Sequence, residues 1–282
     1  MDLIEPYADL DLEDATLVIA LKGWVDGGAV ASQSGEYLAG DGPTVARFRA
    51  DGIFEYGTRR PLIAFDSGRS AEVLWPDLVI RHNRLDDRDL LILVGDEPLA
   101  GWQGVVSDLT DLAAGSGVRR LVTLGALPSQ VAHTKPTPLL ITSNDDALQA
   151  SGVPGGRFVV PAAAANVIDH HLSQNLEIPA VGFWAQVPHY VSGVYWPAVS
   201  VIVERVAMYL GAQIDTSRLE REAKEMIARL DQAVAERPEA QEMLAQMEDA
   251  QQTFEETLGQ DLAGEVEDFL RSMGDDEENP FG

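Results

Sequence analysis

Side chains that can bind ligands or transfer protons follow several short apolar segments of the sequence. Carboxylates and imidazoles that meet at strand ends can act as acid and base, and a lysine beside them can bind an anion. Together with their aromatic and glycine neighbours, the candidate binding residues are Trp24, Asp26, Gly27, Glu97, His133, Lys135, His189 and Tyr190.

The segment from Gly23 to Gly28 has two interpretations. A strand-to-helix turn offers free N–H groups to a phosphate, although this one matches neither the dinucleotide fingerprint nor the P-loop. Alternatively, it is a tight turn in which Asp26 caps the next helix. His133 and His189 also have two interpretations. They are part of an acid/base pocket, or they hold loop backbone by hydrogen bonds, as Pro-flanked histidines can.

Several kinds of site are not expected from this sequence. The absence of Cys removes thiol nucleophiles and zinc–thiolate sites. The 5 histidines include no His-x-x-x-His pair, and the adjacent His170 and His171 would point in different directions on a helix. No Gly-x-Ser-x-Gly elbow is present. We therefore assign no catalytic residue, no metal site and no cofactor.

The elements that position the candidates alternate along residues 1–214. Continuous apolar runs predict strands buried on both faces, and alternation with helices indicates an α/β sandwich. The predicted strands are 16–21, 90–94, 120–124 and 180–184, with short edge strands at 47–49 and 62–64. The predicted helices are 28–38, 102–114, 162–172 and 198–209.

Residues 215–282 are predicted to be an acidic helical extension, separate from the α/β core at 1–214. They hold 20 acidic and 6 basic residues, a net charge of −14 out of −26 for the chain. Apolar residues at helical spacing predict two or three amphipathic helices, with Pro238 in a first turn. The charge run at 275–282 is expected to be disordered.

The charge of the whole chain limits its partners. Nucleic acids and anionic membranes attract basic proteins, so neither is expected to bind a chain of net charge −26. The first residues lack the basic and apolar regions of a signal peptide, and no apolar run reaches the ~18 residues that span a bilayer. We expect a cytoplasmic protein.

Five motifs in order resemble the proteasome-assembly-chaperone 2 family, in its prokaryotic, actinobacterial-type branch. They are Gly23-Trp24-x-Asp26-x-Gly28, Gly95-x-Glu97-Pro98 with Trp102, Leu124-Gly125-Ala126, His133-Thr134-Lys135-Pro136 and Val187-Pro188-His189-Tyr190. The resemblance covers roughly residues 15–212. It implies a three-layer α/β/α sandwich with a central mixed sheet, of the phosphorylase/hydrolase-like type.

The resemblance also implies a role in assembly. Eukaryotic members are non-enzymatic chaperones of proteasome α-type subunits, and some archaeal relatives form homo-oligomers that engage the proteasome through a C-terminal hydrophobic–Tyr–any-residue tail. Here the C-terminus is Pro280-Phe281-Gly282, a degenerate version of that tail. We expect a homo-oligomer, with a trimer as one candidate, and proteasome α-type subunits as candidate partners.

Two hypotheses for function follow. The first is a non-enzymatic assembly or interaction protein that acts as a homo-oligomer. The alternative is a small-molecule-binding protein or a hydrolase- or phosphorylase-like enzyme that uses the strand-end loops. That alternative requires Asp26, Glu97, His133, Lys135 and His189 to meet in one cleft.

Overall fold

The computed structural model describes residues 3–5, 7, 10, 12, 14–144 and 159–252. In this part, the strands are β1 (Ala15–Lys22), β2 (Thr44–Arg47), β3 (Leu62–Asp66), β4 (Arg69–Leu74), β5 (Leu78–Leu85), β6 (Arg88–Asp96), β7 (Val118–Ser129), β8 (Leu139–Ser143) and β9 (Ala180–Pro188). The helices are the 3-10 turn η1 (Gly27–Ala29), α1 (Val30–Ala39), α2 (Ala50–Ile53), α3 (Trp102–Gly115), α4 (Ala164–Leu176), α5 (Trp196–Leu210) and α6 (Ser217–Ala235). Residues 238–252 are also helical.

A mixed sheet of seven strands forms the centre of the molecule, in the order β2-β5-β6-β1-β7-β9-β8. The four inner strands β6, β1, β7 and β9 are parallel. β5 and β8 pair antiparallel with the inner strands β6 and β9, and β2 pairs antiparallel with β5. The inner strands contain all four predicted strands, and β1 is buried along its length up to Lys22. Continuous apolarity therefore predicted these strands correctly, because both their faces are covered.

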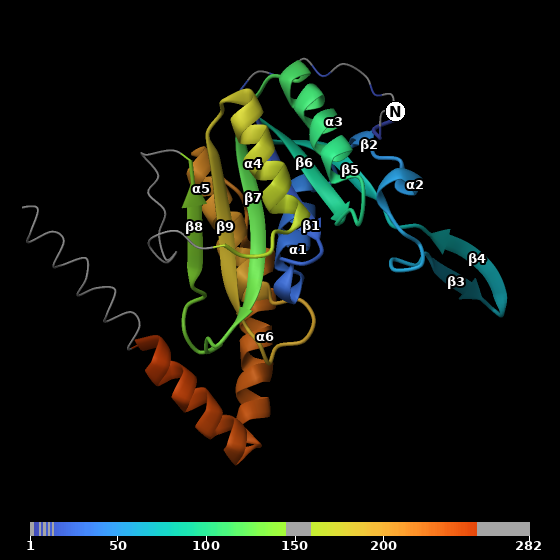
Figure 1. The fold of residues 1–282 in the computed structure, drawn as a ribbon. Coiled ribbons are helices and arrows are strands. Elements are labelled where there is room, and N and C mark those ends of the chain that lie inside the picture. The colour runs from blue at the N-terminus through green and yellow to red at the C-terminus, as the bar shows by residue number, and fades with distance from the viewer. Residues whose placement is uncertain are drawn as a thin grey trace, which may run out of the picture. The chain divides into compact units, whose positions relative to one another are not determined.

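Helices cover both faces of the sheet, as Figure 1 shows. α1 and α5 pack together on one face, and α3 and α4 pack together on the other. The apolar core lies between these layers and includes Leu17, Ile19, Leu91 and Leu93 from adjacent strands. The predicted three-layer α/β/α sandwich with a central mixed sheet is confirmed.

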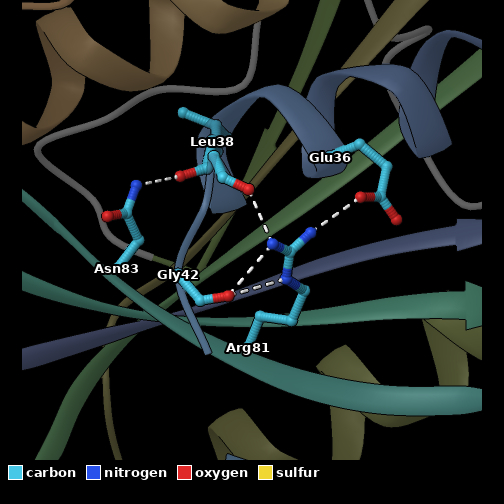
Figure 2. A network of polar contacts seen from close by, with 6 residues as sticks. Glu36, Leu38, Gly42, Arg81 and Asn83 are labelled. Carbon is cyan, nitrogen blue, oxygen red and sulfur yellow. Dashed lines mark hydrogen bonds and ion pairs between the residues drawn. The ribbon is translucent and has the colours of Figure 1, made fainter. Parts of the chain in front are cut away.

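Side chains of β5 bind the C-terminal end of α1 and the residues that follow it (Figure 2). The Arg81 guanidinium of β5 donates to the carbonyl oxygens of Gly40, at 2.6 Å, and Gly42, at 3.0 and 3.1 Å, and pairs with Glu36 at 2.9 Å. The Asn83 amide donates to the Leu38 carbonyl at 2.7 Å. Helix carbonyls without an intrahelical partner are thus satisfied by side chains from the sheet.

Three local predictions need correction. The helix predicted from Gly28 begins at Val30, because Gly28 and Ala29 have positive φ of 59° and 50°. The edge strand predicted at 47–49 is β2, which ends at Arg47. The segment 62–64 is not an edge of the central sheet, since β3 pairs with β4 in a sheet of their own.

The described residues divide into two compact units, 3–129 with 137–226 and 130–136 with 227–252. α6 and the helix at 238–252 confirm the predicted C-terminal helices, whereas the domain boundary at 214/215 stays a prediction. The charge run at 275–282 and the end Pro280–Gly282 lie outside the described residues. None of the described helices is long and apolar enough to cross a membrane.

Candidate functional site

The carboxyl ends of β6, β1, β7 and β9 lie at one edge of the sheet, because these strands are parallel. Each predicted site segment follows one of them. Trp24, Asp26 and Gly27 follow β1, Glu97 follows β6, His133 and Lys135 follow β7, and His189 and Tyr190 follow β9. We call this side of the sheet the carboxyl edge.

Glu97 joins two segments of backbone at the carboxyl edge. Its Oε2 accepts the Trp24 N–H at 2.6 Å, and its Oε1 accepts the Ala164 N–H at 2.7 Å. Ala164 is the first residue of α4, where a negative charge also meets the positive end of the helix dipole. Glu97 therefore fixes the end of β1 against the start of α4, while the Trp24 side chain stays 72% exposed.

Gly23 makes room for this carboxylate. A Cβ atom on Gly23 would lie 2.0 Å from Glu97 Oε2 and 2.4 Å from Glu97 Cβ. Non-bonded atoms cannot approach so closely, so any side chain here would displace Glu97. The first glycine of the Gly-Trp-x-Asp motif thus serves the Glu97 contact.

Asp26 is a helix-capping residue. Its carboxylate accepts the Ser32 N–H at 3.0 Å and the Ser32 hydroxyl at 2.7 Å, in the first turn of α1. Burial raises the pKa of Asp26, and the hydrogen bonds from Ser32 only partly oppose this rise. The capping interpretation of the turn is supported. The N–H groups of Trp24, Asp26 and Ala29 donate to oxygens of this chain.

Gly27 allows the turn to lie against β7. A Cβ there would lie 3.0 Å from the Ala126 carbonyl oxygen and 3.2 Å from Pro128 Cδ. Asp26 forms a parallel bridge with Ala126, and the Ala126 N–H donates to the Val25 carbonyl at 2.7 Å. The glycine is thus needed for close backbone packing.

His189 contacts the end of the neighbouring strand. Its backbone N–H donates to the Ser129 carbonyl at 3.1 Å, and Nδ1 lies 3.4 Å from the same oxygen. Its ring also meets the Tyr190 ring edge-to-face, with centroids 5.6 Å apart. His189 therefore holds loop backbone, which is the second of the interpretations open from the sequence.

His133 belongs to the second unit, and its side chain is fully buried. Its Nε2 lies 3.3 Å from Asp231 Oδ1 on α6. Beside it, the Ala132 N–H donates to Gln251 Oε1 at 3.3 Å, and the Thr134 hydroxyl donates to Glu248. Lys135 closes the loop through its backbone N–H, which donates to the Ala132 carbonyl at 3.3 Å. The loop at 130–136 thus attaches to the C-terminal helices.

The structure therefore brings Trp24 and Glu97 into direct contact and gives Asp26, His133 and His189 other partners. In the part of the chain that it describes, no group of three or more His, Asp or Glu side chains is placed to hold a metal ion.

Sequence reasoning missed two features near this edge. Arg59 donates to the Lys22 carbonyl at 3.2 Å and lies 3.2 Å from Asp96 Oδ1, which ties the segment before β3 to two strand ends. The β3–β4 hairpin carries exposed apolar side chains on both strands. The signal for the hairpin was the Ser67-Gly68 turn that closely follows the apolar run Leu62–Phe65.

A groove of about 390 Å³ lies between α3 and α4 on the face of the sandwich. Its polar lining includes Ser107, Asp111, His171 and Asn175. None of the eight candidate residues lines it.

The model of the PAC2 family matches residues 20–234 of this chain. The chain belongs to the PAC2 family. Among solved structures, it is similar to a Mycobacterium tuberculosis protein of unknown function, Rv2714, with 28% identity and a TM-score of 0.84 over 92% of each chain. No curated protein sequence matches it significantly.

Two further solved structures are similar to this chain. A Corynebacterium glutamicum protein of unknown function is 26% identical, with a TM-score of 0.81 over 88% of this chain and 96% of that one. The M. tuberculosis proteasome-assembly chaperone homologue Rv2125 is 29% identical, with a TM-score of 0.74 over 81% of this chain and 99% of that one. The sequence-based resemblance to the proteasome-assembly-chaperone family is confirmed.

Proposed function

We propose that this PAC2 family protein is a non-enzymatic assembly or interaction protein that works as a homo-oligomer, with proteasome α-type subunits among its partners. One observation carries the proposal: Glu97 fixes the backbone of Trp24 while leaving the indole 72% exposed. An exposed tryptophan is typical of the residues that dominate protein–protein contacts.

The contacts of the other candidates support this proposal. A reactive cleft needs an acid or base that is free to meet a substrate. Asp26 caps α1, Glu97 binds two backbone N–H groups, and His189 contacts the Ser129 carbonyl. The similarity to a proteasome-assembly chaperone homologue in M. tuberculosis supports the choice of proteasome subunits as partners.

Light scattering on the purified full chain tests the oligomer. We expect Trp24→Ala to weaken self-association at least tenfold, as expected for a central contact residue. Met208→Ala is the matched control, because Met208 on α5 is also 72% exposed. A monomeric wild type, or equal effects of the two substitutions, would contradict the proposal.

Co-purification tests the proteasome part. The tagged full chain, with and without Pro280–Gly282, is incubated with α-type subunits from the organism that encodes it. Enrichment of these subunits is expected with the full chain. Absence of enrichment with both forms would remove the proteasome from the proposal and leave the homo-oligomer standing.

A further inference from the structure

The groove between α3 and α4, here called the α3–α4 groove, is large enough for a small molecule. Its volume is about 390 Å³, and cavities that bind small ligands have volumes of roughly 300–1,000 Å³. The two helices that form it lie side by side on one face of the sheet (Figure 1). The groove therefore offers a binding site away from the carboxyl edge.

Two rows of side chains, one from each helix, form the sides of the groove. The members of a row are four residues apart, so they project from the same face of their helix. The rows are Gln103, Ser107 and Asp111 on α3, and Val167, His171 and Asn175 on α4. At 1.5 Å of rise per residue, each row is about 12 Å long. An elongated groove of this kind suits a linear ligand.

The α3–α4 groove has two different ends, because the helices run in the same direction. α3 leads from β6 to β7 and α4 leads into β9, and these three strands are parallel. Both helices therefore begin at the carboxyl edge and run away from it. Asp111 and Asn175 lie in the later part of their helices, whereas Gln103 and Val167 lie in the first turns.

Most of the polar side chains in the groove are not used by the fold. Within the described part of the chain, the side chains of Gln103, Ser107, Asp111 and Asn175 form no hydrogen bond or ion pair. This differs from the carboxyl edge, where Glu97 binds two backbone N–H groups. The polar groups of the groove are therefore free to bind a ligand.

Asp111 determines the charge that the groove favours. Among the described residues that line it, Asp111 is the sole carboxylate, and none is Lys or Arg. A carboxylate without a basic neighbour, in a chain of net charge −26, attracts cations and repels anions. The Asp111 carboxylate, a neutral His171 nitrogen and the Asn175 amide oxygen can accept the three N–H bonds of an ammonium group.

The end of the groove nearer the carboxyl edge is partly apolar. Val106 is 7% exposed and Val167 is half-buried. Methylene groups that leave water for such a surface lower the free energy of binding. The amide of Gln103 can both donate and accept a hydrogen bond, so it suits an uncharged polar group.

We propose that the α3–α4 groove binds a linear aliphatic amine. The ammonium group binds Asp111, His171 and Asn175, and the methylene groups pack on the two valines. A hydroxyl or amide at the far end of the ligand contacts Gln103. None of the candidate residues of the carboxyl edge takes part, so this inference goes beyond the proposed function and is tested independently of it.

Calorimetric titration of the full chain with 5-aminopentan-1-ol tests the role of the charge. We expect one site per chain and a loss of affinity of about tenfold or more for Asp111→Asn. Asp87→Asn is the matched control, because it removes the same charge at an exposed position in the turn between β5 and β6. Pentan-1-ol, which lacks the ammonium group, should bind about tenfold more weakly or worse.

Three results of this titration would each overturn the proposal. They are no binding to wild type, equal losses for Asp111→Asn and Asp87→Asn, and equal affinity for pentan-1-ol. Equal losses would show that the amine is attracted by the net charge of the chain and not by the groove.

Two tryptophan substitutions on α4 test the position of the site. Asn175 and Gln174 are adjacent exposed amides, but only Asn175 lines the groove. We expect Asn175→Trp to abolish binding of 5-aminopentan-1-ol by filling the groove, and Gln174→Trp to leave it unchanged. Circular dichroism checks that both variants fold. Wild-type affinity in Asn175→Trp, or equal losses in both variants, would place the amine elsewhere and overturn the proposal.

Discussion

At the carboxyl edge, polar groups from distant parts of the chain pair with one another, whereas the β3–β4 hairpin at residues 60–75, here called the arm, leaves its apolar side chains in water. Glu97 binds two backbone N–H groups, and Arg59 binds Lys22 and Asp96. In the arm, Phe65 is 65% exposed and no described hydrogen bond or ion pair crosses from its strands to the central sheet. The difference teaches that residue types suited to chemistry can be structural, and residue types suited to a core can be available for contact.

A pair of phenylalanines gives the largest expected contrast. Phe48 is 2% exposed beside the central sheet and Phe65 lies in the arm. We expect Phe48→Ala to lower the free energy of unfolding by about 3–5 kcal/mol, because it leaves a cavity. Phe65→Ala should lower it by less than about 1 kcal/mol in dilute protein. Urea unfolding measures both, and equal losses would show that the arm is packed within a single chain.

Two glycines test the packing of the carboxyl edge. Gly23→Ala places a Cβ within 2.0 Å of Glu97 Oε2, so we expect a loss of about 1–3 kcal/mol in the free energy of unfolding. Gly57→Ala is the control, because a Cβ there meets no atom within 4 Å. Combining Gly23→Ala with Glu97→Ala should cost less than the two separate losses added, since both remove one contact. If the two losses in the free energy of unfolding add fully, Gly23 does not act through the Glu97 contact.

The Arg81 network in Figure 2 gives a smaller effect. Arg81→Ala leaves the carbonyls of Gly40 and Gly42 without this donor, and we expect a loss of about 1–2 kcal/mol in the free energy of unfolding. The loss for Arg81→Lys should lie between those of wild type and Arg81→Ala, because an ammonium group keeps the charge but lacks the several N–H donors of the planar guanidinium. Arg60→Ala, at the exposed start of the arm, should stay within about 0.5 kcal/mol of wild type. A similar loss in the free energy of unfolding for Arg81→Ala and Arg60→Ala would contradict a stabilising role for the Arg81 network.

The smallest expected effect is a pH dependence at Asp26. Its pKa is raised by burial, so the folded chain binds this proton more tightly than the unfolded chain does. Stability from this group is therefore present below its ordinary pKa of 3.8 and is lost as the pH rises through the folded pKa. Asp26→Asn keeps a capping oxygen and should lie within about 0.5 kcal/mol of wild type at pH 7. Urea midpoints should shift in favour of wild type as the pH falls from 7 towards 4, and the opposite shift would contradict burial as the cause.

Sequence reasoning succeeded where the determining contacts are local. The inner strands were predicted because each needs an apolar run that is buried on both faces. The Asp26 cap was open to prediction because its partner Ser32 is six residues away. Pro238 marks the start of the helix at 238–252, since proline fits a first helical turn.

Sequence reasoning failed where a contact joins distant segments of the chain. Glu97 and Ala164 are 67 residues apart, and His133 meets Asp231 on α6. β5 was not predicted because its second half is polar, yet Arg81 and Asn83 there satisfy the end of α1. The residue pattern within a segment does not specify a contact with a residue far away in the sequence.

The sequence by itself determined the α/β class, the buried inner strands and the C-terminal helices, because hydrophobic period acts over a few residues. Only the tertiary structure decided what Glu97, His133 and His189 contact, because strand order brings together segments far apart in the chain. It also decided that the apolar run from Leu62 to Phe65 lies in an exposed arm. Apolarity specifies that a segment should be covered, but not by which surface.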